Sequence, residues 1–269
     1  MQDSFEEPSD EKIHLGGNPT LEATLIPVII LSIWFAISIV LNPLLPPIID
    51  FYVVSLLRFG LLVLFMRQVH GKDLKWAWRN LGFIRPAIKP VLFGLLISLP
   101  MVLIYIGIPL ITGRSLSLLA GWPYLLPVIL VGPGLFEEGL FRGYVFNHYV
   151  TFSKMNWMKA AFFSGILFSL SHLINLLAGV ALFSIFISIT FAFPISFLFG
   201  YMFIKMSKNI WGCVSAHVAI DMVAGTVILS DNTIGLQMVL LFLSIIAIMF
   251  IGFILVNRFY PSEQVVESL

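Results

Sequence analysis

Ionisable side chains are rare inside the apolar segments of this chain, and most of them fall in three short motifs. The first motif, EEGLFR, supplies Glu137, Glu138 and Arg142. The second, FSLSH, ends at His172, and the third, HVAID, begins at His217. An ionisable group at the centre of a bilayer costs roughly 2.5–3.5 kcal/mol on insertion scales, so it is functional by default. We therefore take the three motifs as the candidate site.

The two adjacent glutamates are expected to have different roles. Neighbouring positions on a helix differ by about 100°, so both side chains cannot face one point equally. Arg142 lies four residues after Glu138, which puts the two on one face in the favourable order. A guanidinium group can hold a carboxylate bidentately and keep it ionised. The spacing predicts that Arg142 fixes Glu138 and leaves Glu137 for chemistry, while the Gly132–Pro133–Gly134 sequence just before them loosens or kinks the helix.

In each histidine motif, the imidazole lies at helical spacing from a second polar side chain. This side chain is a carboxylate in one motif and an amide in the other. His217 and Asp221 are four residues apart, so the carboxylate can orient the imidazole and select its tautomer. Asn175 follows His172 by three residues and shares its face. With the glutamates, these groups could activate a water as general base or relay protons in a carrier. The chain shows no internal repeat of the usual transporter kind.

The elements that must position these residues are membrane helices. The 269 residues are 59% hydrophobic and only 11% charged, whereas soluble domains are about 25% charged. The apolar runs are continuous and reach the ~20 residues that a helix needs to cross a bilayer. We predict an all-α polytopic membrane helical bundle of about eight transmembrane helices. The predicted spans are 23–44, 47–68, 88–112, 123–149, 157–178, 181–205, 210–228 and 236–258.

Loop charges give the predicted orientation. Cytoplasmic loops are enriched in Lys and Arg, and one ordering of eight spans puts nearly every loop cation on the side of both termini. Only Arg114 falls in the outside loops. This predicts a multi-pass cell-membrane protein with cytoplasmic N- and C-termini. The inside cations are Arg67, Lys72, Lys75, Arg79, Arg85, Lys89, Lys154, Lys159, Lys205, Lys208 and Arg258.

The rest of the chain suggests no second folded domain. We divide it into a cytoplasmic N-terminal tail (1–20), a membrane domain (21–260) and a C-terminal tail (261–269). The net charge of +1 gives no reason to expect a nucleic-acid partner. The single cysteine, Cys213, rules out an internal disulfide and the multi-cysteine zinc patterns, and it reads as a small buried hydrophobe. The 25 phenylalanines are interpreted as lipid-facing packing.

The three motifs together resemble a known family. EEGLFR is similar to the EExxxR motif of the CAAX-prenyl-protease and bacteriocin-processing (CPBP, or Abi) intramembrane proteases. FSLSH resembles their FxxxH motif, and HVAID resembles their HxxxN/D motif. All three occur in the family's order, on separate predicted membrane helices. The resemblance covers roughly residues 90–228, and the first two spans carry none of it.

The resemblance implies peptide-bond hydrolysis within the bilayer. Glu137 would be the general base that activates a water, with Glu138 supporting it and His172 positioning that water. His217 and the residue at position 221 would stabilise the oxyanion. The prenyl-processing branch of the family carries Asn at this last position, whereas this chain has Asp221. An ionised aspartate would repel an oxyanion, so Asp221 is either protonated by burial or orients His217.

Three questions stay open at the level of sequence. Glu137, His172 and His217 are a plausible zinc set, but a metal-free glutamate mechanism is equally compatible, because the H-E-x-x-H motif is absent. The substrate is expected to be a peptide or a lipidated protein, either of CAAX type or a small peptide such as a bacteriocin or pheromone linked to self-immunity. The alternatives are a proton-coupled transporter and a catalytically inactive scaffold of the same fold.

Overall fold

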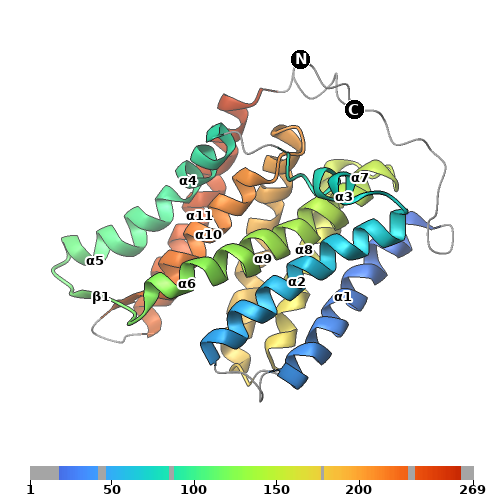
Figure 1. Ribbon diagram of the computed structural model, residues 1–269. Coiled ribbons are helices and arrows are strands. Elements are labelled where there is room, and N and C mark those ends of the chain that lie inside the picture. Colours follow the sequence, from blue (N-terminus) through green and yellow to red (C-terminus); the bar gives the residue numbers. More distant parts are fainter. Residues whose placement is uncertain (1–17, 42–46, 85–87, 177–178, 230–233, 262–269) are drawn as a thin grey trace.

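The computed structural model describes residues 18–41, 47–84, 88–176, 179–229 and 234–261, and they form the predicted all-α polytopic helical bundle (Figure 1). Two long helices come first, α1 (Pro19–Leu41) and α2 (Pro47–His70). A short helix, α3 (Leu74–Asn80), follows in the basic loop and is capped by Asp73, whose carboxylate accepts a hydrogen bond from the Trp76 amide at 2.6 Å.

The remaining helices carry several stretches of wider, π-helical winding. α4 (Ile88–Val102) passes through the π-helical Leu103–Gly107 into α5 (Ile108–Ile111). α6 (Trp122–Ile129) continues through two π-helical stretches, Leu130–Glu137 and Gly139–Phe146, into α7 (Asn147–Thr151). α8 (Trp157–Ser171) follows and ends in the short 3-10 turn His172–Leu176. The last long helices are α9 (Leu182–Lys205), α10 (Trp211–Thr226) and α11 (Ile234–Phe259).

Six of the described helical stretches are long and apolar enough to cross a bilayer. They match six of the eight predicted spans, so the count of eight is not confirmed. The other two predictions fall on α2 and α10. α2 has 24 residues and carries Arg58 and Arg67. α10 has 16 residues, about 24 Å of helix, which is less than the hydrocarbon core of about 30 Å. The six stretches are Pro19–Ile37, Ile88–Ile111, Trp122–Thr151, Trp157–Leu176, Leu182–Lys205 and Gly235–Phe259.

The continuous helix from Trp122 to Thr151 is the centre of the bundle. Its π-helical stretches contact α1, α2, α8, α9 and α10, so most long helices pack against it. Phe136, Leu140, Phe141 and Phe146 are almost fully buried in these contacts. The motif EEGLFR therefore lies on the most enclosed helix of the molecule.

A small antiparallel sheet, which no sequence pattern predicted, joins two distant segments. β1 (Leu116–Leu118) pairs with β2 (Val227–Leu229), with Ser117 opposite Ile228. The sheet connects the segment before α6 with the end of α10. It lies at the end of the bundle opposite to α3 and α7 (Figure 1).

Candidate active site

The helix that carries the two glutamates is wound more widely than an α-helix. Pro133 has no backbone N–H to donate, and it lies between Gly132 and Gly134 inside the first π-helical stretch. The predicted loosening of the helix at Gly-Pro-Gly therefore takes the form of π winding, which continues past the glutamates to Phe146. π-helical segments are rare and are frequent at functional sites.

Glu138 is completely buried and is held by two cationic or polar groups. Its Oε1 accepts a hydrogen bond from Arg142 Nη1 at 2.9 Å, so the predicted i,i+4 pair forms through one oxygen and one nitrogen. The same Oε1 lies 2.6 Å from His217 Nδ1 of α10. The other carboxylate oxygen, Oε2, is buried without a hydrogen-bond partner among the described residues. Because buried polar atoms are almost always hydrogen-bonded, Oε2 is an acceptor suited to a water or a substrate donor.

His217 bridges two carboxylates. Since an ionised carboxylate can only accept, Nδ1 is the donor to Glu138. Nε2 faces Asp221 Oδ2 at 3.6 Å, which agrees with the predicted pairing but is longer than a hydrogen bond. The side chain of His217 is 12% exposed and that of Asp221 is 35% exposed, whereas Glu138 has no exposed surface. The site is thus closed at Glu138 and opens towards Asp221.

His172 begins the 3-10 turn at the end of α8, and its tautomer follows from one contact. Nδ1 lies 3.0 Å from the carbonyl oxygen of Phe168. A carbonyl can only accept, so Nδ1 carries the proton and, in a neutral ring, Nε2 is an acceptor. Such a nitrogen can accept a hydrogen bond from a water molecule.

Glu137 completes a group of five carboxylate and imidazole side chains beside Arg142. It is partly exposed, unlike its neighbour Glu138. Its charge acts on His217 and on Asp221, and Asp221 also feels the charges of His172 and Glu138. The three motifs, which are far apart in sequence, therefore meet within electrostatic reach of one another. Asn175 is half-buried in the 3-10 turn, and no side-chain hydrogen bond from it to these five residues is described.

Two buried phenylalanines support the site, and the interpretation of the phenylalanines as lipid-facing is wrong for them. Phe168 is 3% exposed and Phe199 is 0% exposed. The guanidinium carbon of Arg142 lies 4.5 Å from the ring centroid of Phe168 and 5.2 Å from that of Phe199. Phe168 also packs edge-on against His172 and His217. In the sequence, the signal for this role was that Phe168 is the first residue of the FSLSH motif.

α10 approaches the glutamate helix closely because glycine replaces larger side chains at both contacts. A Cβ at Gly134 would lie 2.7 Å from Val218 Cγ2 of α10. On the other side, a Cβ at Gly94 of α4 would lie 2.1 Å from the Gly212 carbonyl oxygen. These distances are shorter than van der Waals contact, so both positions need glycine. The close packing is what brings His217 within hydrogen-bonding distance of Glu138.

The predicted zinc ligands do not form a metal-binding group. Among the described residues, which include all three, no three His, Cys, Asp or Glu side chains are arranged to hold a metal ion. His217 directs Nδ1 to Glu138 and Nε2 to Asp221, and His172 directs Nδ1 to a carbonyl oxygen. The set Glu137, His172 and His217 therefore does not fit a zinc ion in this arrangement, and we derive no step through a metal.

Comparison with protein families agrees with the motifs. Residues 119–223 match the family model described as "Type II CAAX prenyl endopeptidase Rce1-like". This match supports a membrane protease of the CPBP family. The matched segment runs from just before α6 into α10, and it contains all three motifs. Comparison with curated proteins gives no match, and comparison with solved structures gives none either.

Proposed function

We propose that this protein is an intramembrane endopeptidase that uses Glu137 as general base. The observation that carries the proposal is the different surroundings of the two glutamates. Glu138 is fully buried, and its Oε1 is held by both Arg142 and His217, which favours a fixed, ionised carboxylate. Glu137 is partly exposed beside it and acts electrostatically on His217 and Asp221.

In the proposed reaction, Glu137 removes a proton from a water while the water oxygen attacks the scissile carbonyl carbon. Nε2 of His172 accepts a hydrogen bond from the same water and orients it. The tetrahedral oxyanion accepts a hydrogen bond from Nε2–H of a doubly protonated His217. Glu137 then returns its proton to the amide nitrogen as the carbon–nitrogen bond breaks. Positioned acid–base groups contribute about 10²–10⁴-fold, and oxyanion donors act most strongly where water is scarce.

Asp221 is assigned to orienting His217. The 3.6 Å between Asp221 Oδ2 and His217 Nε2 leaves this nitrogen free to share its proton with a substrate oxygen. The bond from Nδ1 to Glu138 fixes the ring from the other side. Of the two alternatives for Asp221, orientation accounts for this arrangement directly.

The proposed substrate is a peptide or protein with a CAAX-type C-terminus. This class follows from the family description, which names a CAAX prenyl endopeptidase. Small peptides such as bacteriocins or pheromones remain the second class within the same reaction. Both substrates would be cleaved by the same water.

The test is cleavage by the purified full chain in lipid nanodiscs. The substrates are fluorescent peptides with a CAAX terminus, one farnesylated and one not. We expect Glu137→Gln to lower kcat by about 10²–10⁴-fold and to leave the thermal midpoint unchanged. Proton flux without cleavage in the unchanged chain would favour a carrier. Full cleavage by Glu137→Gln would overturn the assignment of the base.

A further inference from the structure

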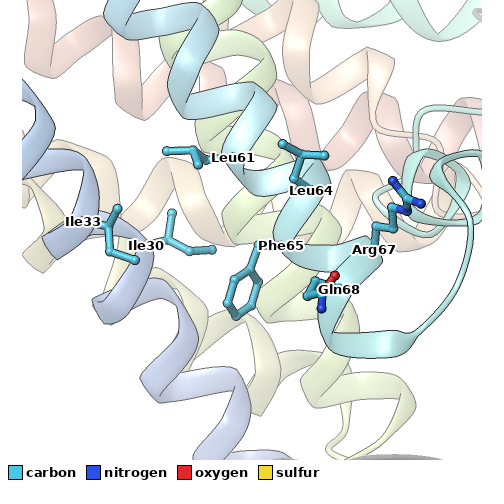
Figure 2. Close-up of a pocket in the computed structure, with 7 residues that line it drawn as sticks. All are labelled: Ile30, Ile33, Leu61, Leu64, Phe65, Arg67 and Gln68. Atoms are coloured by element: carbon cyan, nitrogen blue, oxygen red, sulfur yellow. The ribbon is translucent and has the colours of Figure 1, made fainter.

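A groove of about 330 Å³ opens between α1 and α2, on the part of the molecule that the family match does not cover. Its walls are apolar and come from both helices, with Ile30 and Ile33 on α1 and Leu61, Leu64 and Phe65 on α2 (Figure 2). Leu64 is 52% exposed and Ile33 is 46% exposed. In a membrane, a groove with these apolar walls is in contact with the acyl chains of lipids.

One end of the α1–α2 groove is polar and positively charged. Arg67 and Gln68, in the last turns of α2, line it and are exposed (Figure 2). α3 begins at Leu74, only a few residues after α2, and carries the further cations Lys75 and Arg79. The groove thus combines an apolar slot with a cationic, hydrogen-bonding end. This combination complements an anion attached to a hydrocarbon chain.

The groove is separated from the glutamate–histidine site by α2 itself. Leu62 and Met66 on the opposite face of α2 are fully buried. Leu62 packs against the glutamate helix, where a Cβ at Gly139 would lie 3.1 Å from its Cδ2. A molecule in the groove therefore contacts the outer face of α2, while the inner face supports the helix that carries Glu137 and Glu138.

We propose that the α1–α2 groove binds an anionic phospholipid. One acyl chain lies along Ile30, Ile33, Leu61 and Leu64, and the phosphate accepts hydrogen bonds from Arg67 and Gln68. Basic pockets between transmembrane helices are the typical place for anionic headgroups. This inference does not depend on the proposed peptidase activity.

The test is native mass spectrometry of the delipidated full chain with phosphatidylglycerol or phosphatidylcholine of identical acyl chains. We expect one phosphatidylglycerol to be retained in preference to phosphatidylcholine. Arg67→Gln should weaken this binding roughly five-fold, the effect of one basic side chain at a lipid headgroup. Leu64→Trp, which fills the slot, should weaken the binding of both lipids.

Matched variants distinguish this site from general attraction of anionic lipid to a basic surface. Arg258→Gln removes the same charge from the exposed end of α11, and Leu95→Trp enlarges an exposed side chain on α4. Both should bind phosphatidylglycerol like the unchanged chain. Equal binding of the two lipids, or an equal effect of Arg67→Gln and Arg258→Gln, would overturn the proposal. Competition by inorganic phosphate at millimolar concentration would overturn the role of the acyl chain.

Discussion

At the scale of single residues, the site depends on hydrogen bonds that give each imidazole a defined donor and acceptor. His217 donates to Glu138, which Arg142 also holds, and His172 donates to a backbone carbonyl. Nε2 of His217 faces Asp221, and Nε2 of His172 is the acceptor of a neutral ring.

Asp221 provides a direct test of this orientation. Asp221→Asn keeps an oxygen that can accept from His217 Nε2, whereas Asp221→Ala removes it. We expect Asp221→Asn to cleave a CAAX-type peptide within a few-fold of the unchanged chain. Asp221→Ala should lower kcat about 10–100-fold, because it removes the polar oxygen that faces Nε2 and leaves the ring held only from the Glu138 side, a loss of about 1.5–3 kcal/mol. If both variants had the same rate, Asp221 would not act on His217 through its side-chain oxygen.

Phe168 gives a second prediction at this scale, since its ring contacts Arg142, His172 and His217. Phe168→Leu should lower the free energy of unfolding by about 1–2 kcal/mol through the lost cation–π contact and packing. It should also reduce kcat more than it changes KM. Phe163→Leu is the matched control, because Phe163 is on the same helix and 45% exposed. Thermal unfolding and steady-state kinetics in nanodiscs measure both effects, and an equal loss in the two variants would refute a supporting role.

Part of the site could be predicted from sequence and part could not. The Glu138–Arg142 and His217–Asp221 pairs lie within single helices, so their four-residue spacing was sufficient. The Glu138–His217 bond joins residues 79 positions apart, and no local spacing encodes it. Phe168 was part of a recognised motif, but the abundance of phenylalanine in this chain concealed its individual role.

At the scale of elements, the close packing of α10 determines whether His217 reaches Glu138. Gly94→Ala would place a Cβ 2.1 Å from the Gly212 carbonyl oxygen, so α4 and α10 must separate. We expect a loss of about 1–3 kcal/mol in unfolding free energy, typical of overpacking, together with reduced cleavage. Thermal melts and peptide cleavage by the same preparation measure it.

The control for this prediction lies on α10 itself. A Cβ at Gly225 would meet nothing within 4 Å, so Gly225→Ala should leave both stability and cleavage close to those of the unchanged chain. Equal effects of the two substitutions would show that helix propensity, and not the contact between α4 and α10, is responsible.

Apolar runs predicted the long helices well, but they gave less information on how the helices are wound and where they end. The π winding from Leu130 to Phe146 has only Gly-Pro-Gly as a local signal, and it extends well beyond that signal. α10 ends at Thr226 because the following residues pair with β1, a contact between segments about 110 positions apart in sequence. Hydropathy averaged over a short stretch of sequence carries no information on such tertiary contacts.

At the scale of the whole molecule, charge is distributed unevenly between the two ends of the bundle. α3, α7, the start of α1 and the end of α11 lie at one end (Figure 1). Arg114 follows α5 near the sheet at the other end. This distribution is the basis of the proposed orientation, with the α3 end in the cytoplasm.

Cysteine labelling tests the orientation, because Cys213 is the single cysteine and is buried. In a Cys213→Ala background, Arg114→Cys should react with a membrane-impermeant maleimide on intact cells. Lys75→Cys should react only after the cells are opened. The reverse pattern would invert the proposed topology, although it would leave the geometry of the site unchanged.

The anchoring of α10 has a mechanical consequence. At its first residues, the Ile210 amide donates to the Gly82 carbonyl at 3.0 Å and the Trp211 indole donates to the Ile84 carbonyl at 2.8 Å. At its far end, the Thr226 carbonyl accepts from the Leu119 amide at 2.8 Å. Contacts at both ends therefore hold α10, and they must break before this helix can move outward. In the proposed reaction, a polypeptide would reach His217 more readily by displacement of helices other than α10.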